Sequence, residues 1–352
     1  MLVWASAVLA EATDVVQEFD LHSAIREKLA AGSRVLELEN RTYRMNRTVV
    51  MEGVSGFTLK GNGARLIWTI PKRAFQISDC HRLAFSGFSI DYDPIPFTQG
   101  AVLSVDPGRS EMTVQLHEGY PGFKRERHLY THVFHAETRL WKLTALDFQT
   151  SVVKQVDDNT YIMKLENLPG TYKPEYIEAG DLVAFDWRGE CAVALREGSS
   201  ELEFHDITFY SAPSCAVVAT YCGGGHVYQN VRITRGPTPS GATEPRLLST
   251  SADGLHYYAC AGGPTVDGCD FSFMGDDSMN LCGPVLPVLA QPTPDTLLVF
   301  RPYPREDLAK VITPGREIRV LAKGNFAPIG KSQVAAFSRE AEGMVTVEDL
   351  KR

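Results

Sequence analysis

The chain has 352 residues, of which 44% are hydrophobic and 22% are charged. These proportions are typical of globular proteins and exclude wholesale disorder, collagen-like repeats and long coiled coils. Asp and Glu together number 43 against 35 Lys and Arg, so the formal net charge is -8. That balance gives no electrostatic reason to expect nucleic acid or anionic lipid as a partner, and no stretch approaches the about 18 apolar residues of a membrane span.

The first ten residues form a short apolar stretch that ends in small residues, similar to the tail of a secretion signal. We therefore expect a secreted or periplasmic protein. Residues 14–31 follow with apolar side chains at helical spacing, and Gly32 stands where a helix would stop. The seven cysteines contain no CxxC pair, so the sequence gives no sign of a zinc site or a dense disulfide scaffold.

A short apolar motif then recurs along the chain. Each copy has three apolar residues, with a Gly, Asp or Asn before the middle one that marks a bend. The copies are 83–90, 202–209, 226–233 and 265–271, with bends at Gly87, Asp206, Asn230 and Gly268. The step from Phe204 to Tyr228 is 24 residues, which is the length of one coil of a right-handed parallel β-helix. A β-sandwich with coincidental spacing is the alternative.

The repeat predicts an all-β fold, a right-handed parallel β-helix (solenoid) with an N-terminal capping helix and inserted β-barrel segments. Residues 1–98 would form the cap and the first coils, and residues 99–190, which alternate like strands without the bent repeat, an inserted barrel. Residues 191–284 would form further coils with the candidate site, and residues 285–352 a second barrel-like segment. Because the chain ends at Arg352 without returning to the repeat, we expect this last segment to be truncated.

The densest polar clusters of the repeats are residues 249–256 and 275–280. Asp253 precedes Asp276 by 23 residues, about one coil, so Asp253 should lie beside Asp276 or Asp277. Carboxylates held together disfavour the state in which all are ionised, so one can act as a general acid and another as a base. Glycosidic bond cleavage needs these two groups. Aspartates that cap turns and a Ca²⁺ site are the alternatives.

The Asp-Gly pair at 253–254, followed one coil later by Gly-Asp-Asp at 275–277, resembles the catalytic pattern of the polygalacturonase-like β-helix glycosidases. Segments 90–100, 252–256 and 269–280, together with the barrel-like insertion, are more similar to the bacterial α-1,3-galactosidase family of β-helix glycoside hydrolases. The His-Gly and Arg-x-Lys elements of the polygalacturonases are not evident, which argues against a galacturonate substrate.

The resemblance implies an exo-acting, inverting α-1,3-galactosidase that needs no metal or other cofactor. Its substrate would be an oligosaccharide or glycoconjugate with a terminal α-linked galactose. Under this resemblance Asp253, Asp276 and Asp277 would supply the acid and the base, although the sequence does not say which residue has which role. The resemblance covers most of residues 35–326.

Six further residues are expected to contact the substrate, and each has a structural alternative. His256 follows Asp253 by three residues and would be buried if its strand stays straight, and Asn280 would form a ladder inside the coil. The other four flank the insertion and would otherwise anchor the barrel: Trp187, Arg188, Tyr92 and Asp93.

Three histidines, His128, His132 and His135, have the spacing of a metal-binding stripe on a helix, but their surroundings are not helical and we expect no metal there. Two other functions remain open. One is a carbohydrate-binding β-helix without catalysis, and the other is a different β-helix glycosidase or a polysaccharide lyase, which would need Ca²⁺ and an Arg or Lys base. The sequence also leaves a homo-oligomer open.

Overall fold

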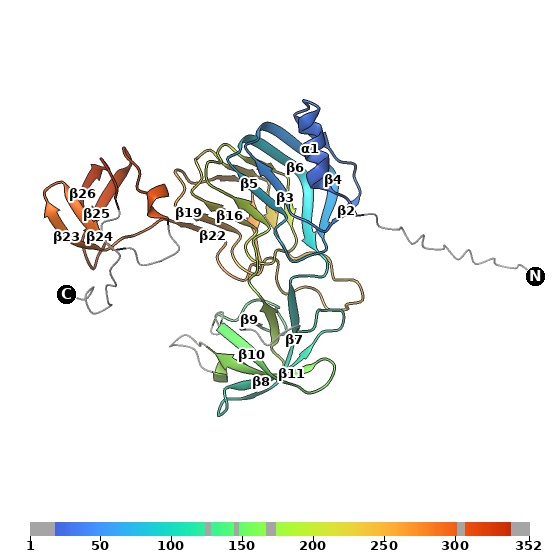
Figure 1. Cartoon of the computed structure of the whole chain (residues 1–352). Helices are drawn as coiled ribbons and strands as arrows, with labels where there is room; N and C mark the ends of the chain where they lie inside the picture. Colours follow the sequence, from blue (N-terminus) through green and yellow to red (C-terminus); the bar gives the residue numbers. More distant parts are fainter. Residues whose placement is uncertain (1–17, 124–127, 144–147, 167–173, 301–306, 339–352) are drawn as a thin grey trace, which may run out of the picture.

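The structure is a computed structural model that describes residues 18–123, 128–143, 148–166, 174–300 and 307–338. It consists mostly of β-strands, arranged as a stack of coils, a barrel and C-terminal hairpins (Figure 1). The apolar start of the chain, on which the expectation of export rests, lies outside the described residues. No helix within the described ranges is both long and apolar enough to cross a membrane.

Helix α1 (Leu21–Ala30) lies against the first coil (Figure 1). The side chain of Asp20 accepts a hydrogen bond of 3.0 Å from a backbone N–H of the first turn, which caps the helix. Leu21 and Ile25 are buried and belong to the core that the coils share. Of the helix expected over residues 14–31, the described residues show Leu21–Ala30, and residues 14–17 lie outside the described part of the chain.

Two sheets of parallel strands run along the stack, and consecutive coils supply neighbouring strands in each. The first sheet contains β1 (Val35–Glu37), β2 (Thr42–Met45), β4 (Ser55–Trp68), β6 (His81–Tyr92), β14 (Glu203–His205), β15 (Thr208–Phe209), β17 (Val227–Gln229), β18 (Arg232–Ile233), β20 (Thr265–Asp267) and β21 (Asp270–Phe271). The second contains β3 (Val49–Glu52), β5 (Phe75–Ser78), β13 (Val193–Leu195), β16 (Val217–Thr220), β19 (Leu255–Tyr258) and β22 (Met279–Cys282).

The repeated motif sets the register of the first sheet. Phe204 pairs with Phe85 on one side and with Tyr228 on the other, which confirms the alignment of the copies. The rings of Phe204 and Tyr228 stack with their centroids 5.0 Å apart. The bends at Asp206 and Asn230 share a left-handed backbone, with φ of 52° and 53°, and Asn230 Nδ2 donates to Asp206 Oδ1 at 3.1 Å. Polar bends and apolar residues therefore both stack from coil to coil.

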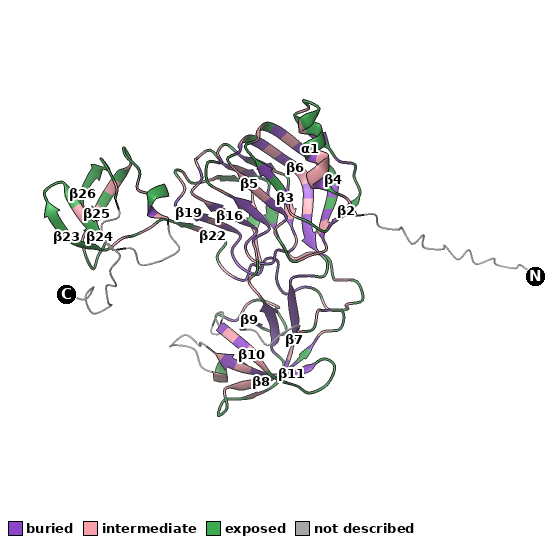
Figure 2. Cartoon of the chain, viewed as in Figure 1, coloured by how far each residue is buried: buried purple, intermediate pink, exposed green. Residues whose placement is uncertain are grey.

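A closed barrel of six antiparallel strands interrupts the chain between β6 and β13 (Figure 1). It contains β7 (Phe97–Asp106), β8 (Glu111–Leu116), β9 (Leu129–Phe134), β10 (Phe148–Gln155), β11 (Thr160–Glu166) and β12 (Leu182–Asp186), with the short 3-10 helix η1 (Pro174–Tyr176) before β12. The barrel has an apolar core of its own, which includes Val114, Met163 and Phe185. Figure 2 shows buried positions along the strands of the barrel. The inserted barrel expected from the sequence is thus observed.

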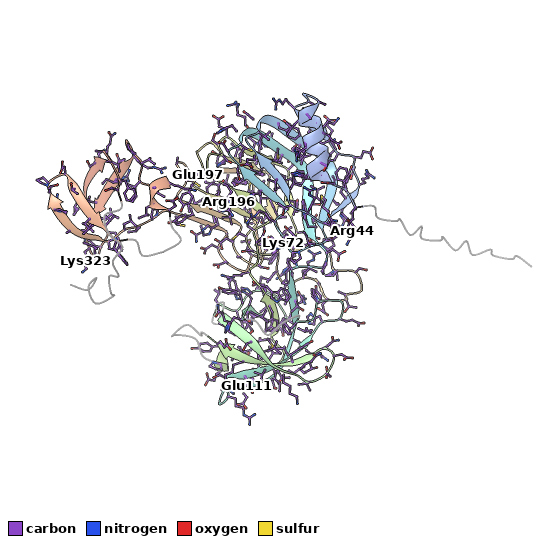
Figure 3. All side chains as sticks on the ribbon, in the orientation of Figure 1. Arg44, Lys72, Glu111, Arg196, Glu197 and Lys323 are labelled. Atoms are coloured by element: carbon purple, nitrogen blue, oxygen red, sulfur yellow. The ribbon has the colours of Figure 1, made fainter. Side chains whose placement is uncertain are left out.

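The described residues after Pro284 form two separate hairpins, β23 (Val288–Thr293) with β24 (Thr296–Val299) and β25 (Glu317–Leu321) with β26 (Pro328–Gln333). Within these residues no second barrel closes, which corrects that expectation. The physical reason is burial, since β23 and β26 are exposed along their whole length (Figure 2) and offer no core to enclose. Lys310, in the 3-10 helix η2 (Leu308–Lys310), forms an ion pair with Glu197 of the coils. Glu197 is labelled in Figure 3.

Candidate active site

Connections leave the coil stack at equivalent positions, after the first sheet and before the second, and three of them carry the barrel and the candidate aspartates. The barrel follows β6, residues 234–254 follow β18, and residues 272–278 follow β21. Since β6, β15, β18 and β21 are consecutive neighbours in one sheet, these connections emerge on the same side of the stack. The three aspartates expected to be catalytic all lie there, in the second and third connections.

The register of the coils decides which aspartate faces which. Strands β19 and β22 pair at a step of 24 residues. The same step continues into the preceding turn, where Gly254 N donates to Asp277 O at 2.9 Å. Asp277, rather than Asp276, therefore stands opposite Asp253, with backbones about 4.8 Å apart. The Asp253 side chain is only 8% exposed, whereas Asp277 is exposed.

His256 lies among the three carboxylates. Its Nδ1 is 2.7 Å from Asp253 Oδ2. This hydrogen bond raises the pKa of His256 against the opposing effect of burial, and the charges of Asp276 and Asp277 raise it further. On the neighbouring strand, Asn280 Nδ2 donates to Asp277 Oδ2 at 3.1 Å. The structure thus brings together five of the residues that the sequence singled out.

Arg188 reaches this cluster from the end of the barrel. Its Nη1 lies 2.9 Å from Asp276 Oδ2, and its Nη2 donates to Gly275 O at 3.3 Å. The guanidinium lies over the Tyr130 ring, 3.8 Å from the centroid. The backbone N–H of Arg188 donates to Asp186 Oδ1 at 2.8 Å with φ at 36°, an uncommon conformation for a residue other than glycine. These contacts show that the Arg188 guanidinium binds Asp276 and Gly275 of the chain itself, and not a position open to a ligand.

The remaining three candidates do not join the cluster. Trp187 is half-buried and packs against the barrel core, as the anchoring alternative required. Tyr92 is 1% exposed, and its hydroxyl donates to Lys72 O at 2.9 Å, which corrects the prediction that it contacts substrate. Asp93 pairs with Arg44 of β2 at 2.8 Å, and it follows β6, three strands from β21 in the sheet.

The three histidines lie on or beside strand β9 rather than on a helix. His132 is fully buried, with Nε2 2.9 Å from Asp186 Oδ2, and His128 pairs with Glu166. His135 follows the strand. Across the described part of the chain, no group of three or more His, Cys, Asp or Glu side chains is placed to hold a metal ion.

The sequence reasoning missed the contacts that dock residues 234–254 on strand β6 of the coils and on strand β7 of the barrel. Arg246 forms a bidentate ion pair with Asp91, at 2.8 and 2.9 Å, and both residues are buried. The Gln99 side chain donates to Pro245 O at 2.9 Å and accepts from Leu247 N at 2.7 Å. An Arg inside a Pro/Gly/Ser/Thr-rich loop was the one available signal, and nothing in the sequence pairs it with a residue 155 positions earlier.

No family model matches the chain. Among curated proteins, alpha-1,3-galactosidase B of Bacteroides thetaiotaomicron is 23% identical over 291 residues, which are 72% of this chain and 43% of that protein. The chain therefore spans less than half the length of this relative.

Two solved structures show distant similarity. A Parabacteroides merdae protein provisionally named a glycosyl hydrolase has a TM-score of 0.29 at 11% identity, over 75% of this chain and 86% of that chain. A tailspike of an Acinetobacter baumannii bacteriophage, in complex with capsular saccharide, has a TM-score of 0.20 at 10% identity, over 73% of this chain and 44% of that chain. The sequence relationship to the galactosidase, at its low identity, supports a glycoside-hydrolase-like protein without deciding which member.

Proposed function

We propose that the aspartate cluster is the active site of a glycoside hydrolase that removes a terminal α-1,3-linked galactose. We also propose that the two parallel sheets form a right-handed parallel β-helix. The observation that carries the functional proposal is the meeting of Asp253, Asp276 and Asp277 around His256, in two neighbouring coils. The relative named alpha-1,3-galactosidase B supports the substrate class.

In the proposed reaction, one carboxyl group protonates the leaving oxygen and a carboxylate activates water on the opposite face of the sugar. A cation favours the ionised form of a carboxyl group beside it, so the Arg188 contact suits Asp276 to the role of base. By the same argument the His256 imidazole beside Asp253 counts against Asp253 as the acid, which leaves Asp277 as the first candidate for that role and Asp253 as the second. A dinitrophenyl galactoside separates these two, because its leaving group needs no protonation and the variant that lacks the acid keeps its activity on that substrate.

The stereochemical outcome follows from the distance between the acting carboxyl groups. Inversion needs about 6.5–9.5 Å between them, so that a water molecule fits. Stacked coils separate the backbones of Asp253 and Asp277 by about 4.8 Å, so the side chains of an inverting pair must diverge. Proton NMR of the first product formed distinguishes the outcomes, since inversion of an α-galactoside releases β-galactose.

A carbohydrate-binding protein without catalysis is the second candidate. It is favoured by the engagement of two carboxylates with basic side chains, Asp253 with His256 and Asp276 with Arg188. Calorimetric titration with α-1,3-galactosyl disaccharide, followed by assay for free galactose, separates the two. Binding without release would support this candidate and contradict the hydrolase.

A panel of p-nitrophenyl glycosides and α-1,3-linked disaccharides tests the substrate class. We expect release from α-galactosides and no release from galacturonides. Activity should persist in a chelator, and no unsaturated product that absorbs in the ultraviolet should form, which would exclude the lyase alternative. We further propose that the protein works outside the cytoplasm, as its apolar first residues suggest.

A further inference from the structure

Two cysteines occupy the same corner of neighbouring coils. Strands β16 and β19 pair with Thr220 opposite Tyr258, and Cys222 and Cys260 each follow two residues later. The correspondence continues beyond the strands, because Ala261 N donates to Cys222 O at 2.9 Å. Adjacent strands are about 4.8 Å apart, a separation within the about 4.4–6.8 Å between Cα atoms that a disulfide spans.

The backbone turns in the same way at both cysteines. The residue before each has a left-handed conformation, with φ of 56° at Tyr221 and 53° at Ala259. Equivalent backbones direct equivalent side chains alike, so the two thiols stack as the apolar residues of the coils do. The interaction of each thiol with its neighbour lowers the pKa of Cys260 to about 7 and raises the pKa of Cys222.

The two thiols differ in their access to solvent. Cys222 is buried at 3% exposure, and its Sγ donates to the carbonyl of Arg196, a residue labelled in Figure 3, at 3.4 Å. Cys260 is half-buried, and its Sγ donates to Tyr258 O at 3.6 Å. Cys260 is thus the thiol that a soluble oxidant can reach, and Cys222 is the thiol that stands next to it.

We propose that Cys222 and Cys260 form a disulfide that joins neighbouring coils when the chain meets a low-molecular-weight disulfide such as glutathione disulfide. The Cys260 thiolate attacks one sulfur of glutathione disulfide and releases one glutathione thiolate. The Cys222 sulfur, losing its proton, then attacks the Cys260 sulfur and releases the second glutathione. Two protein thiols are oxidised to one disulfide, and one glutathione disulfide is reduced to two glutathione molecules. This inference is independent of the proposed hydrolase activity.

A second in-register pair provides an internal control. Cys191 and Cys215 also lie in neighbouring coils, since Ala192 N donates to Cys215 O at 3.0 Å. Both are buried. Burial raises the pKa of Cys191, and it raises the pKa of Cys215 to about 12. Because the thiolate is the attacking species, this pair should stay reduced where Cys222 and Cys260 react.

The test uses the full chain, reduced, desalted and incubated with glutathione disulfide at neutral pH. After denaturation, alkylation and digestion, mass spectrometry should find a peptide pair joined through Cys222 and Cys260, with Cys191 and Cys215 alkylated. In Cys222→Ser, Cys260 should stop at a mixed disulfide with glutathione. In Cys260→Ser, Cys222 should remain alkylatable.

The proposal is overturned if Cys222 and Cys260 both remain alkylatable in the wild-type chain. It is also overturned if Cys260 joins a different cysteine, or if the Cys191 and Cys215 pair oxidises as fast. Galactosidase assays on the same samples are unaffected by these outcomes, so failure of the disulfide and failure of the hydrolase are read separately.

Discussion

Removing Arg246 should destabilise the fold strongly, because it leaves the buried Asp91 carboxylate without its cation. Breaking a buried ion pair costs about 3–5 kcal/mol. The Ser211 hydroxyl and the Tyr92 N–H also donate to Asp91 Oδ1, at 2.6 and 2.9 Å, and both remain after the substitution. We therefore expect the lower end of that range, a loss of about 3 kcal/mol in the free energy of unfolding for Arg246→Ala.

The chain contains a matched control two residues from Asp91. The Arg44–Asp93 pair has the same short distance, 2.8 Å, but Asp93 is 60% exposed. Arg44→Ala should thus lose less than about 1 kcal/mol. Urea denaturation measures both without adding salt that screens charges. Combining Arg246→Ala with Asp91→Asn should restore part of the stability, because no buried charge is then unpaired. Equal losses for Arg246→Ala and Arg44→Ala would refute the reasoning.

Three further predictions concern the cluster. Arg188→Ala should lower kcat/KM about tenfold, the equivalent of about 1.4 kcal/mol, because Asp276 is then free to move. Arg188→Lys should lower kcat/KM less. Equal kcat/KM for the wild type and both variants would contradict this prediction. Asp253 raises the pKa of His256 in the folded protein. The interaction between His256 and Asp253 therefore stabilises the fold fully at pH values below the ordinary histidine pKa. This stabilisation is lost as the pH rises through the raised pKa of the folded state. His256→Ala should therefore cost more stability at about pH 5 than at about pH 9 in thermal denaturation, and a pH-independent cost would be inconsistent with it. Gly275→Ala should reduce both stability and activity, because the added Cβ would lie 2.6 Å from a backbone oxygen of the neighbouring coil; wild-type melting and turnover would show that the turn can relax.

The repeat carried most of the correct fold prediction because its information is local. Apolar residues at Phe204 and Tyr228, with a bend residue shortly after each, suffice to predict that equivalent positions stack, and the pairing confirms it. The same logic brought Asp253 to the neighbouring aspartates. The repeat did not decide whether Asp276 or Asp277 lies opposite Asp253. That choice depends on the register of the turns before β19 and β22, which hydrogen bonds such as the one from Gly254 N to Asp277 O set at 24 residues.

Contacts between distant segments escaped prediction. Arg188 was expected to bind a sugar, but its guanidinium is held by Asp276, 88 residues later in the chain. Tyr92 was expected at the surface because it flanks the insertion, yet its strand alternation places it in the core. The C-terminal strands alternate like those of a barrel, but alternation does not reveal whether a strand finds enough partners to close one.

The central claim is that Asp253, Asp276 and Asp277 perform acid–base hydrolysis of an α-1,3-linked galactoside. Its most direct test is galactose release from an α-1,3-galactosyl disaccharide by the wild-type chain, by the Asn variant of each aspartate, and by Asp93→Asn as the control. We predict release by the wild type and by the control, and a loss of about 10²–10⁴-fold in kcat for the other variants. No release by the wild type, or full activity in all three variants, would contradict the claim.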